Sequence, residues 1–150
     1  MITIRQASLE DLDRIHEIEK TSFSNPWSRR NLELDIANSL LTYYEVILIH
    51  GIVIGYMGAY VFGDEAHISN VAIDLDFRRS GYGTRLLDHY MESLKARGVK
   101  DFTLEVRDDN VAALKLYASQ GLVPEGVRKN YYADLGRDAI VMWKREEEEA

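Results

Sequence analysis

Residues 71–84 read VAIDLDFRRSGYGT and decide the fold prediction, because they join a strand to a helix through a loop with two glycines. The apolar start, the carboxylate-rich turn and the amphipathic segment after residue 84 indicate that order. Glycines at a helix start let the main chain approach a ligand, and the unpaired N–H groups there favour phosphate. The local pattern alone is equally compatible with an ordinary turn that carries solvated arginines.

The composition predicts one globular domain. A chain of 150 residues with 46% hydrophobic content is large enough for a sizeable core, so we expect a single domain over 1–145. The chain has no cysteine, which excludes disulfides, thiolate metal sites and a cysteinyl intermediate. No basic and apolar leader and no membrane-spanning run is present, so we expect a cytoplasmic location.

The charge distribution argues against some partners. The formal net charge is −7, of which four charges come from the glutamates at 146–149, leaving −3 for residues 1–145. We expect residues 146–150 to form a disordered acidic tail. An acidic body without a lysine and arginine stripe argues against direct nucleic acid binding. His16 and Glu19, and likewise His89 and Glu92, lie one helical turn apart; we interpret both pairs as surface residues and assign no metal.

The order of elements predicts a mixed α/β sheet. Strand patterns alternate with helical patterns in a way that fits neither a doubly wound nor an all-antiparallel fold. If strands 66–73 and 102–106 are neighbours, the helix between them makes them parallel. The expected strands are 2–4, 43–49, 52–62, 66–73, 102–106, 122–129 and 138–144, and the expected helices are 9–20, 28–37, 83–97 and 110–120.

Three familiar glycine motifs do not match. A dinucleotide fingerprint needs a small residue three positions after Gly83, where this chain has Leu86. No Walker-type phosphate loop and no hydrolase elbow of the form G-x-S-x-G occurs. We therefore expect neither a Rossmann dehydrogenase nor a nucleotide hydrolase.

The spacing Arg78-x-x-Gly81-x-Gly83 resembles the acetyl-CoA signature of the GNAT acetyltransferases, (Gln/Arg)-x-x-Gly-x-(Gly/Ala). Within that family the chain resembles the RimI-type ribosomal-protein-alanine N-acetyltransferases, and the resemblance covers residues 1–145. Leu122 stands where the family often has phenylalanine. Further matching motifs are Asn25-Pro26-Trp27, Leu104-Glu105-Val106-Arg107, Asn110-x-x-Ala113-x-x-Leu116-Tyr117, Arg128-Lys129-Asn130-Tyr131-Tyr132 and Asp138-Ala139.

The resemblance implies the GNAT fold, with about seven strands, about four helices and a sheet that splays between the fourth and fifth strands. It also implies acetyl-CoA as cosubstrate. The loop then holds the pyrophosphate, and backbone amides of the splayed strand meet the acetyl carbonyl and the pantetheine arm. The implied cofactor-binding residues are Val71, Ala72, Ile73, Arg78, Arg79, Ser80, Gly81, Tyr82, Gly83, Thr84, Asn110 and Tyr117.

Two residues are implied to be catalytic. Glu105 points away from the predicted core face, and pattern alone favours a surface partner of Arg107. The resemblance instead makes Glu105 the general base, acting through water or with a pKa raised by burial. Tyr117 has a helical position typical of a core tyrosine. The resemblance makes it the general acid for the CoA thiolate, and Asn110 is either a helix cap or a pantetheine contact.

The implied acceptor is the α-amine at the N-terminus of a protein, with a ribosomal protein as the expected partner. The aromatic segments 23–27 and 130–132 form the rim of its site if they meet. Local pattern alone also allows these residues to be packing residues. The candidate substrate-binding residues are Phe23, Pro26, Trp27, Tyr131 and Tyr132. Acetylation of lysine or of a small amine, and a CoA-binding module without turnover, are the alternatives.

Overall fold

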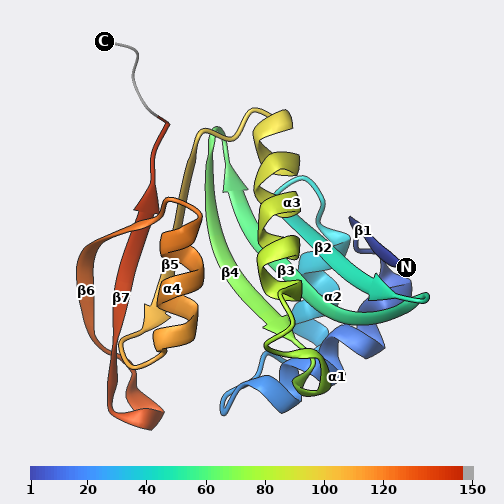
Figure 1. The fold of residues 1–150 in the computed structure, drawn as a ribbon, viewed down its shortest axis with the longest axis horizontal. Helices are drawn as coiled ribbons and strands as arrows, with labels where there is room; N and C mark the ends of the chain where they lie inside the picture. Colours follow the sequence, from blue (N-terminus) through green and yellow to red (C-terminus); the bar gives the residue numbers. More distant parts are fainter. Residues whose placement is uncertain (147–150) are drawn as a thin grey trace.

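The computed structural model describes residues 1–146, in which seven strands form one sheet in the order β1-β2-β3-β4-β5-β7-β6 (Figure 1). This arrangement confirms the predicted mixed sheet. The strands are β1 (Ile2–Gln6), β2 (Thr42–Ile49), β3 (Ile52–Phe62), β4 (Glu65–Ile73), β5 (Asp101–Arg107), β6 (Val123–Tyr132) and β7 (Arg137–Lys144). The helices are α1 (Leu12–Ser22), α2 (Arg29–Ala37), α3 (Tyr82–Ala96) and α4 (Val111–Ser119).

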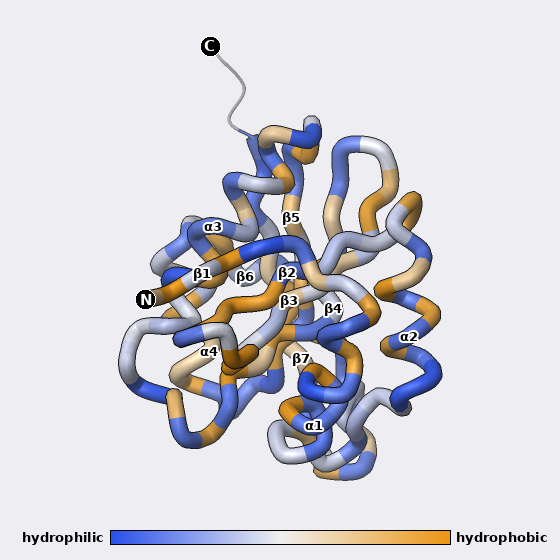
Figure 2. Tube along the Cα trace, turned by 90° about the vertical axis from the view of Figure 1, so that its right-hand side faces the viewer, coloured by the Kyte–Doolittle hydropathy of each residue, from blue (hydrophilic) through white to orange (hydrophobic). Residues whose placement is uncertain are grey.

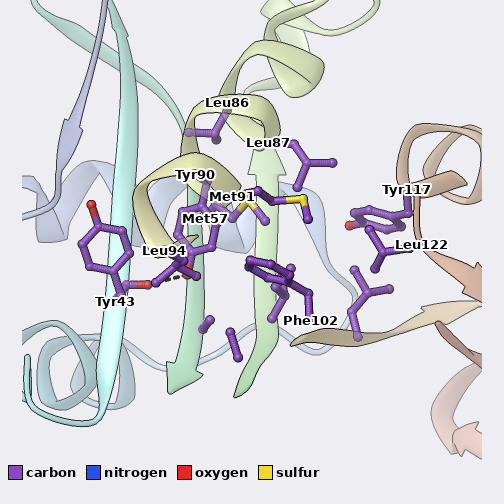
Figure 3. Close-up of a cluster of buried hydrophobic side chains, with 14 of the residues drawn as sticks. Tyr43, Met57, Leu86, Leu87, Tyr90, Met91, Leu94, Phe102, Tyr117 and Leu122 are labelled. Atoms are coloured by element: carbon purple, nitrogen blue, oxygen red, sulfur yellow. Dashed lines mark hydrogen bonds between the residues drawn. The ribbon is translucent and has the colours of Figure 1, made fainter. Parts of the chain in front are cut away.

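The helices cover the sheet from both sides. Helices α3 and α4 lie on one face and α1 and α2 on the other (Figures 1 and 2). Alternate strand residues therefore enter two separate apolar clusters. The cluster under α3 includes Leu87, Met91 and Phe102 (Figure 3). The cluster under α1 and α2 includes Ile15 of α1, Leu32 of α2 and buried side chains of the central strands.

Strands β4 and β5 are paired over a short length. Their parallel register runs from Glu65 opposite Asp101 to Ile68 opposite Leu104. Beyond that point β4 pairs with β3 alone and β5 with β7, and the two strands diverge in Figure 1. The parallel pair and the splay between the fourth and fifth strands were both predicted.

Side-chain caps fix the helix starts. The side chains of Ser28 and Asn110 accept hydrogen bonds from the N–H groups of Asn31 and Ala113. Asn110 therefore has the first of its two predicted roles, that of a helix cap. The first helix starts later than predicted, because residues 9–11 form a 3₁₀ turn. Leu9 on that turn is exposed rather than part of the buried face.

The end of β6 differs from the prediction. Tyr131 and Tyr132 were expected in a loop, but pairing with β7 resumes at Tyr132 opposite Arg137, so both belong to the strand. The register shifts between Arg128 and Tyr132, where Asn130 has a φ of 53°. Asparagine tolerates this left-handed conformation, which lets the strand bend without ending.

Two further predictions concern membrane-spanning segments and the acidic tail. In the described part of the chain, no helix is both long enough and apolar enough to cross a bilayer. The predicted acidic tail, apart from Glu146, lies outside the described residues. The N–H of Glu146 donates to Asp101 Oδ1 at 3.0 Å.

Candidate active site

The loop before α3 presents free main-chain donors. The N–H of Arg85 donates to Gly81 O at 3.1 Å, which closes the first helical turn. The N–H groups of Tyr82, Gly83 and Thr84 precede that bond and therefore point out of the helix start. Gly81 has a φ of 81°, which favours glycine. These donors lie at the positive end of the helix and are suited to bind an anion.

Gly83 is not required by the packing of the protein alone. A Cβ at this position would lie 3.7 Å from Leu116 Cδ2 and 3.9 Å from Ile73 Cγ1, which are ordinary van der Waals contacts. The absence of a side chain therefore leaves the N–H groups of the first turn accessible at close range. This cradle fits a pyrophosphate that contacts the main chain.

The two arginines of the loop have different surroundings. Arg78 Nε donates to Ile73 O at 2.8 Å, and its Nη2 donates to Ser22 Oγ at 3.0 Å. Arg78 thus ties the loop to the end of β4 and to the end of α1. Arg79 is exposed, with a φ of 63°, and Ser80 beside it is also exposed.

The splayed end of β4 offers further main-chain donors. The N–H of Asp74 donates to Ile54 O on β3 at 2.7 Å. Since N–H direction alternates along a strand, the N–H of Ala72 also faces β3, whereas those of Val71 and Ile73 face the β5 side. Both lie beyond the last β4–β5 pair at Ile68. They are suited to bind a carbonyl oxygen or an amide of an inserted ligand.

Glu105 lies on β5 with its side chain 8% exposed. Its Oε2 is 2.6 Å from His67 Nε2 and its Oε1 is 3.5 Å from Arg128 Nε. Pairing with Arg107 was the local alternative and is wrong, because Arg107 pairs with Asp109. Burial acts to raise the pKa of Glu105, but the hydrogen bond from His67 and the nearby charges outweigh it and lower the pKa. Of the two alternatives for Glu105, a pKa raised by burial is therefore wrong, and action through a water stays a prediction.

Tyr117 on α4 is 8% exposed and belongs to the cluster under α3. Its ring extends from α4 toward Leu87 and Met91 (Figure 3). Burial raises the pKa of Tyr117 well above its ordinary value, so the phenol stays protonated. Glu105 alternates with Leu104 and Val106, which enter the same cluster as Tyr117, so Glu105 projects from the opposite face of the sheet.

One hydrogen bond joins the loops that carry the two predicted aromatic segments. Ser24 Oγ donates to Asp134 Oδ2 at 2.9 Å, which joins the loop after α1 to the turn after β6. Phe23 is 41% exposed and Tyr131 is 47% exposed. Trp27 and Pro26 are half-buried, and Trp27 packs on the cluster under α1 and α2.

Tyr131 and Tyr132 sit near the carboxylate. Their rings contact edge to face, with centroids 5.1 Å apart. Arg128 bridges this pair to Glu105, since its guanidinium carbon is 5.8 Å from the Tyr131 ring centroid and its Nε is 3.5 Å from Glu105. Tyr131 and the candidate base are therefore linked through Arg128.

Comparison with known proteins agrees with this geometry. Residues 12–122 match the model of the acetyltransferase (GNAT) family.

The chain belongs to the GNAT acetyltransferase family.

Among its relatives, the ribosomal protein bS18-alanine N-acetyltransferase of Escherichia coli K12 is 35% identical over 144 residues, which are 95% of this chain and 96% of the relative. The Salmonella typhimurium LT2 protein of the same name is 37% identical over 148 residues, again 95% and 96%. The crystal structure of the Escherichia coli ribosomal-protein-S18-alanine N-acetyltransferase superposes with a TM-score of 0.91 at 32% identity. That alignment covers 100% of this chain and 97% of the other. This GNAT chain is therefore an N-acetyltransferase of a family that uses acetyl-CoA.

Sequence reasoning missed one buried residue beside the site of this GNAT enzyme. Glu19 was expected at the surface, which is wrong, because it is 1% exposed. It accepts hydrogen bonds from the N–H of Trp27 at 3.0 Å, from the Tyr56 hydroxyl and from the Asn70 side chain. Burial raises its pKa. Glu19 follows Ile15 by four residues, so its place on the buried helical stripe was readable from the sequence.

We predict that Glu19→Ala destabilises the GNAT fold by about 2 kcal/mol or more, because the donors of Trp27, Tyr56 and Asn70 lose a buried acceptor. Urea unfolding followed by circular dichroism measures the change. Glu17→Ala is the matched control on the same helix, where the side chain is 66% exposed, and should stay within about 0.5 kcal/mol. Equal effects of the two substitutions would contradict a structural role for Glu19.

Proposed function

We propose that this enzyme transfers the acetyl group of acetyl-CoA to the α-amine at the N-terminus of a protein. The acceptor that we propose is the N-terminal alanine of ribosomal protein bS18. Relatives named for that activity are 35% and 37% identical to this chain over nearly their whole length. A ribosomal acceptor implies that the reaction takes place in the cytoplasm.

The observation that carries the proposal is the opening of the sheet between β4 and β5. Tyr117 lies on the face covered by α3 and α4, whereas Glu105 projects from the opposite face, against which Trp27 packs. Arg128 links Glu105 to the ring of Tyr131. Cosubstrate and acceptor thus have separate approaches that converge where the strands diverge. This arrangement supports direct attack in a ternary complex rather than a covalent enzyme intermediate, and the chain has no cysteine for such an intermediate.

The residues that would hold acetyl-CoA are those with free main-chain donors. We infer that the turn from Arg78 to Thr84 binds the pyrophosphate and that the N–H groups of Val71 and Ile73 bind the pantetheine arm and polarise the carbonyl. Asn110 already accepts from the Ala113 N–H at 3.2 Å, so its side-chain amide N–H remains for the pantetheine arm. When bound, acetyl-CoA supplies an activated thioester.

The acid and base roles follow from charge and burial. Glu105 is ionised at neutral pH, because its partners hold its pKa low, and it can therefore accept a proton through a water. Tyr117 remains a phenol over the same range. Its contribution is a hydrogen bond to the sulfur as negative charge develops there.

Protonation energetics favours a chain end over lysine. The α-amine has a pKa of about 7.7 to 8.0 and the lysine amine about 10.4, so neutral lysine costs roughly 3 to 4 kcal/mol more at pH 7. Glu105 has a lowered pKa and is therefore a weak base, so it deprotonates the N-terminal ammonium more readily than the less acidic lysine ammonium. The joined loops around Phe23 and Tyr131 also suit a terminus better than the middle of a peptide.

We predict that Gly83→Val weakens acetyl-CoA binding at least about tenfold, because the side chain covers main-chain donors at the helix start. Isothermal titration calorimetry measures the affinity. Gly126→Val is the control, since a Cβ there meets nothing closer than Val141 Cβ at 4.0 Å. Unchanged affinity in folded Gly83→Val would place the cosubstrate elsewhere.

We predict that Glu105→Gln lowers kcat by about 10² or more, the range for loss of general base assistance, while acetyl-CoA affinity is retained. Tyr117→Phe should lower kcat as well. A continuous assay of released thiol measures both rates, and Ser119→Ala is the control on α4, where the side chain is exposed. Wild-type turnover by both folded variants would show that the catalytic assignment is wrong.

We predict that a peptide that begins with alanine and carries an internal lysine is acetylated predominantly at its N-terminus. The lower pKa of the α-amine and the narrow rim are the reasons. Tandem mass spectrometry locates the acetyl group, and the same peptide with a blocked N-terminus is the control. Equal rates on the blocked peptide would favour a side-chain acetyltransferase instead.

A further inference from the structure

An arginine reaches the candidate base from across β7. Arg128 of β6 lies opposite Ala139 of β7, and Ala139 lies opposite Arg107 of β5. Arg107 is two residues from Glu105, so all four side chains are on one face of the sheet. Because Ala139 is small, the Arg128 side chain can cross β7, and its Nε lies 3.5 Å from Glu105 Oε1. Arg128 thus contacts the carboxylate from a strand that is not a neighbour of β5.

The two carboxylate oxygens of Glu105 are held with unequal strength. Oε2 accepts a hydrogen bond from the Nε2–H of His67 at 2.6 Å. Oε1 faces Arg128 at 3.5 Å, which is longer than the usual N–H to oxygen distance of about 2.9 Å. The Arg128 side chain is 59% exposed, and an exposed ion pair contributes little to stability. Oε1 is therefore the oxygen whose partner can be exchanged.

Arg128 has a second partner within reach. Its guanidinium carbon is 5.8 Å from the centroid of the Tyr131 ring, close to the outer limit of about 6 Å for a cation–π contact. Tyr131 is 47% exposed and is one of the candidate substrate-binding residues. The next basic side chain, Lys129, has a carboxylate of its own in Asp138. Arg128 is therefore placed between a carboxylate and an aromatic ring, with a long contact to each.

We propose that Arg128 occupies, in the free enzyme, the place at Glu105 Oε1 that the acceptor ammonium needs, and that the acceptor displaces it onto the ring of Tyr131. The inference rests on the proposed function, which it deepens by adding a positioning residue for the acceptor. At neutral pH an α-amine with a pKa of about 7.7 to 8.0 arrives mainly as the ammonium. Two cations at one oxygen repel each other, so the arrival of one favours the departure of the other. A cation thus stays beside the nearly buried carboxylate in both states.

The groups around Glu105 on β4 and β6 are compatible with this exchange. Burial acts to raise the pKa of Glu105, but the hydrogen bond from His67 and the charges of His67 and Arg128 lower it, so the carboxylate is ionised when the acceptor arrives. Burial raises the pKa of Tyr131 and of Tyr132, and the charge of Glu105 acts in the same direction. Both phenols are therefore neutral at neutral pH, and Arg128 meets Tyr131 as a cation over a neutral ring.

The substitution Arg128→Gln removes the charge but leaves a side chain that can donate a hydrogen bond. The matched control is Arg145→Gln, because Arg145 pairs with Glu125 and its guanidinium carbon lies 4.3 Å from the centroid of the Trp143 ring. The two arginine side chains are 59% and 49% exposed. Both substitutions remove an arginine that contacts a glutamate and an aromatic ring, but only the first lies beside Glu105.

The first measurement is the affinity of an alanine peptide for the enzyme with bound CoA, determined by isothermal titration calorimetry. In Tyr131→Leu the displaced guanidinium has no ring to contact, so this background isolates the competition at Glu105. Adding Arg128→Gln to Tyr131→Leu should strengthen peptide binding about threefold, the size expected of an exposed ion pair that no longer competes. Adding Arg145→Gln instead should leave the affinity unchanged. Unchanged or weaker binding on adding Arg128→Gln overturns the displacement, because a merely structural arginine gives no such rescue.

The second measurement follows the arginine itself by NMR of the Nε–H resonances, in the free enzyme and with CoA and peptide bound. The peptide should shift the Arg128 resonance upfield in the wild type, because the guanidinium moves over the Tyr131 ring, and should shift it less in Tyr131→Leu. The Arg145 resonance should stay unchanged. An Arg128 resonance that the peptide leaves in place also overturns the displacement.

An assay of acetyl transfer by the wild type tests the proposed function separately. If the wild type neither binds nor acetylates the alanine peptide, the proposed acceptor is wrong. Both measurements then use whichever amine the enzyme acetylates, and the same outcomes decide whether that amine displaces Arg128.

Discussion

The early end of the β4–β5 pairing is the constraint on which the site depends. Four register pairs join the strands, and beyond Ile68 and Leu104 each strand keeps one neighbour. Main-chain groups inside a protein need partners, and a strand with one free edge leaves every second N–H and C=O without one. The unpaired main-chain groups of the diverging strands can bind a ligand, since a ligand with amide and carbonyl groups can occupy the place of the missing neighbour.

Two apolar clusters hold the opened sheet in shape. One lies under α3 and α4 and contains Phe102 and Leu104, and the other lies under α1 and α2 around Ile15. Hydrogen bonds add to this packing, since Glu19 of α1 accepts from the Tyr56 hydroxyl on β3 and from the N–H of Trp27 in the loop after α1. The strands can therefore diverge without loss of packing, because the cluster under α3 and α4 includes residues of both strands, such as Ile68 of β4 and Leu104 of β5.

The sequence was sufficient for features that depend on nearby residues. Asn110 caps a helix, which was one of its two predicted roles, and the order of strands and helices followed from periodicity and turn residues. The partners of Glu105 were not predictable, because His67 and Arg128 reach it through the register of three strands. Local spacing pointed instead to Arg107, two residues away.

The roles of Glu105 and Tyr117 likewise came from resemblance to a family rather than from pattern. A glutamate on a polar strand face and a tyrosine on an apolar helix face have commoner explanations. Glu19 is a different case, because it was misassigned although its position four residues after Ile15 placed it on the buried side. The charge of Glu19 suggested an exposed side chain, whereas the helical spacing from Ile15 indicated a buried one. A buried glutamate persists where several donors surround it.

Arg78 connects the loop before α3 to the loop after α1. Its guanidinium contacts Ile73 O at the mouth of the splay and Ser22 Oγ, which directly precedes the aromatic loop at Phe23. One side chain is thus shared between the candidate phosphate loop and the loop that carries Phe23. A ligand that draws Arg78 toward phosphate releases Ser22, and the loop that follows Ser22 loses an anchor. Such sharing couples two sites thermodynamically, and the coupling has the same size in both directions. The position of this arginine therefore links the conformation of the loop before α3 to that of the loop after α1.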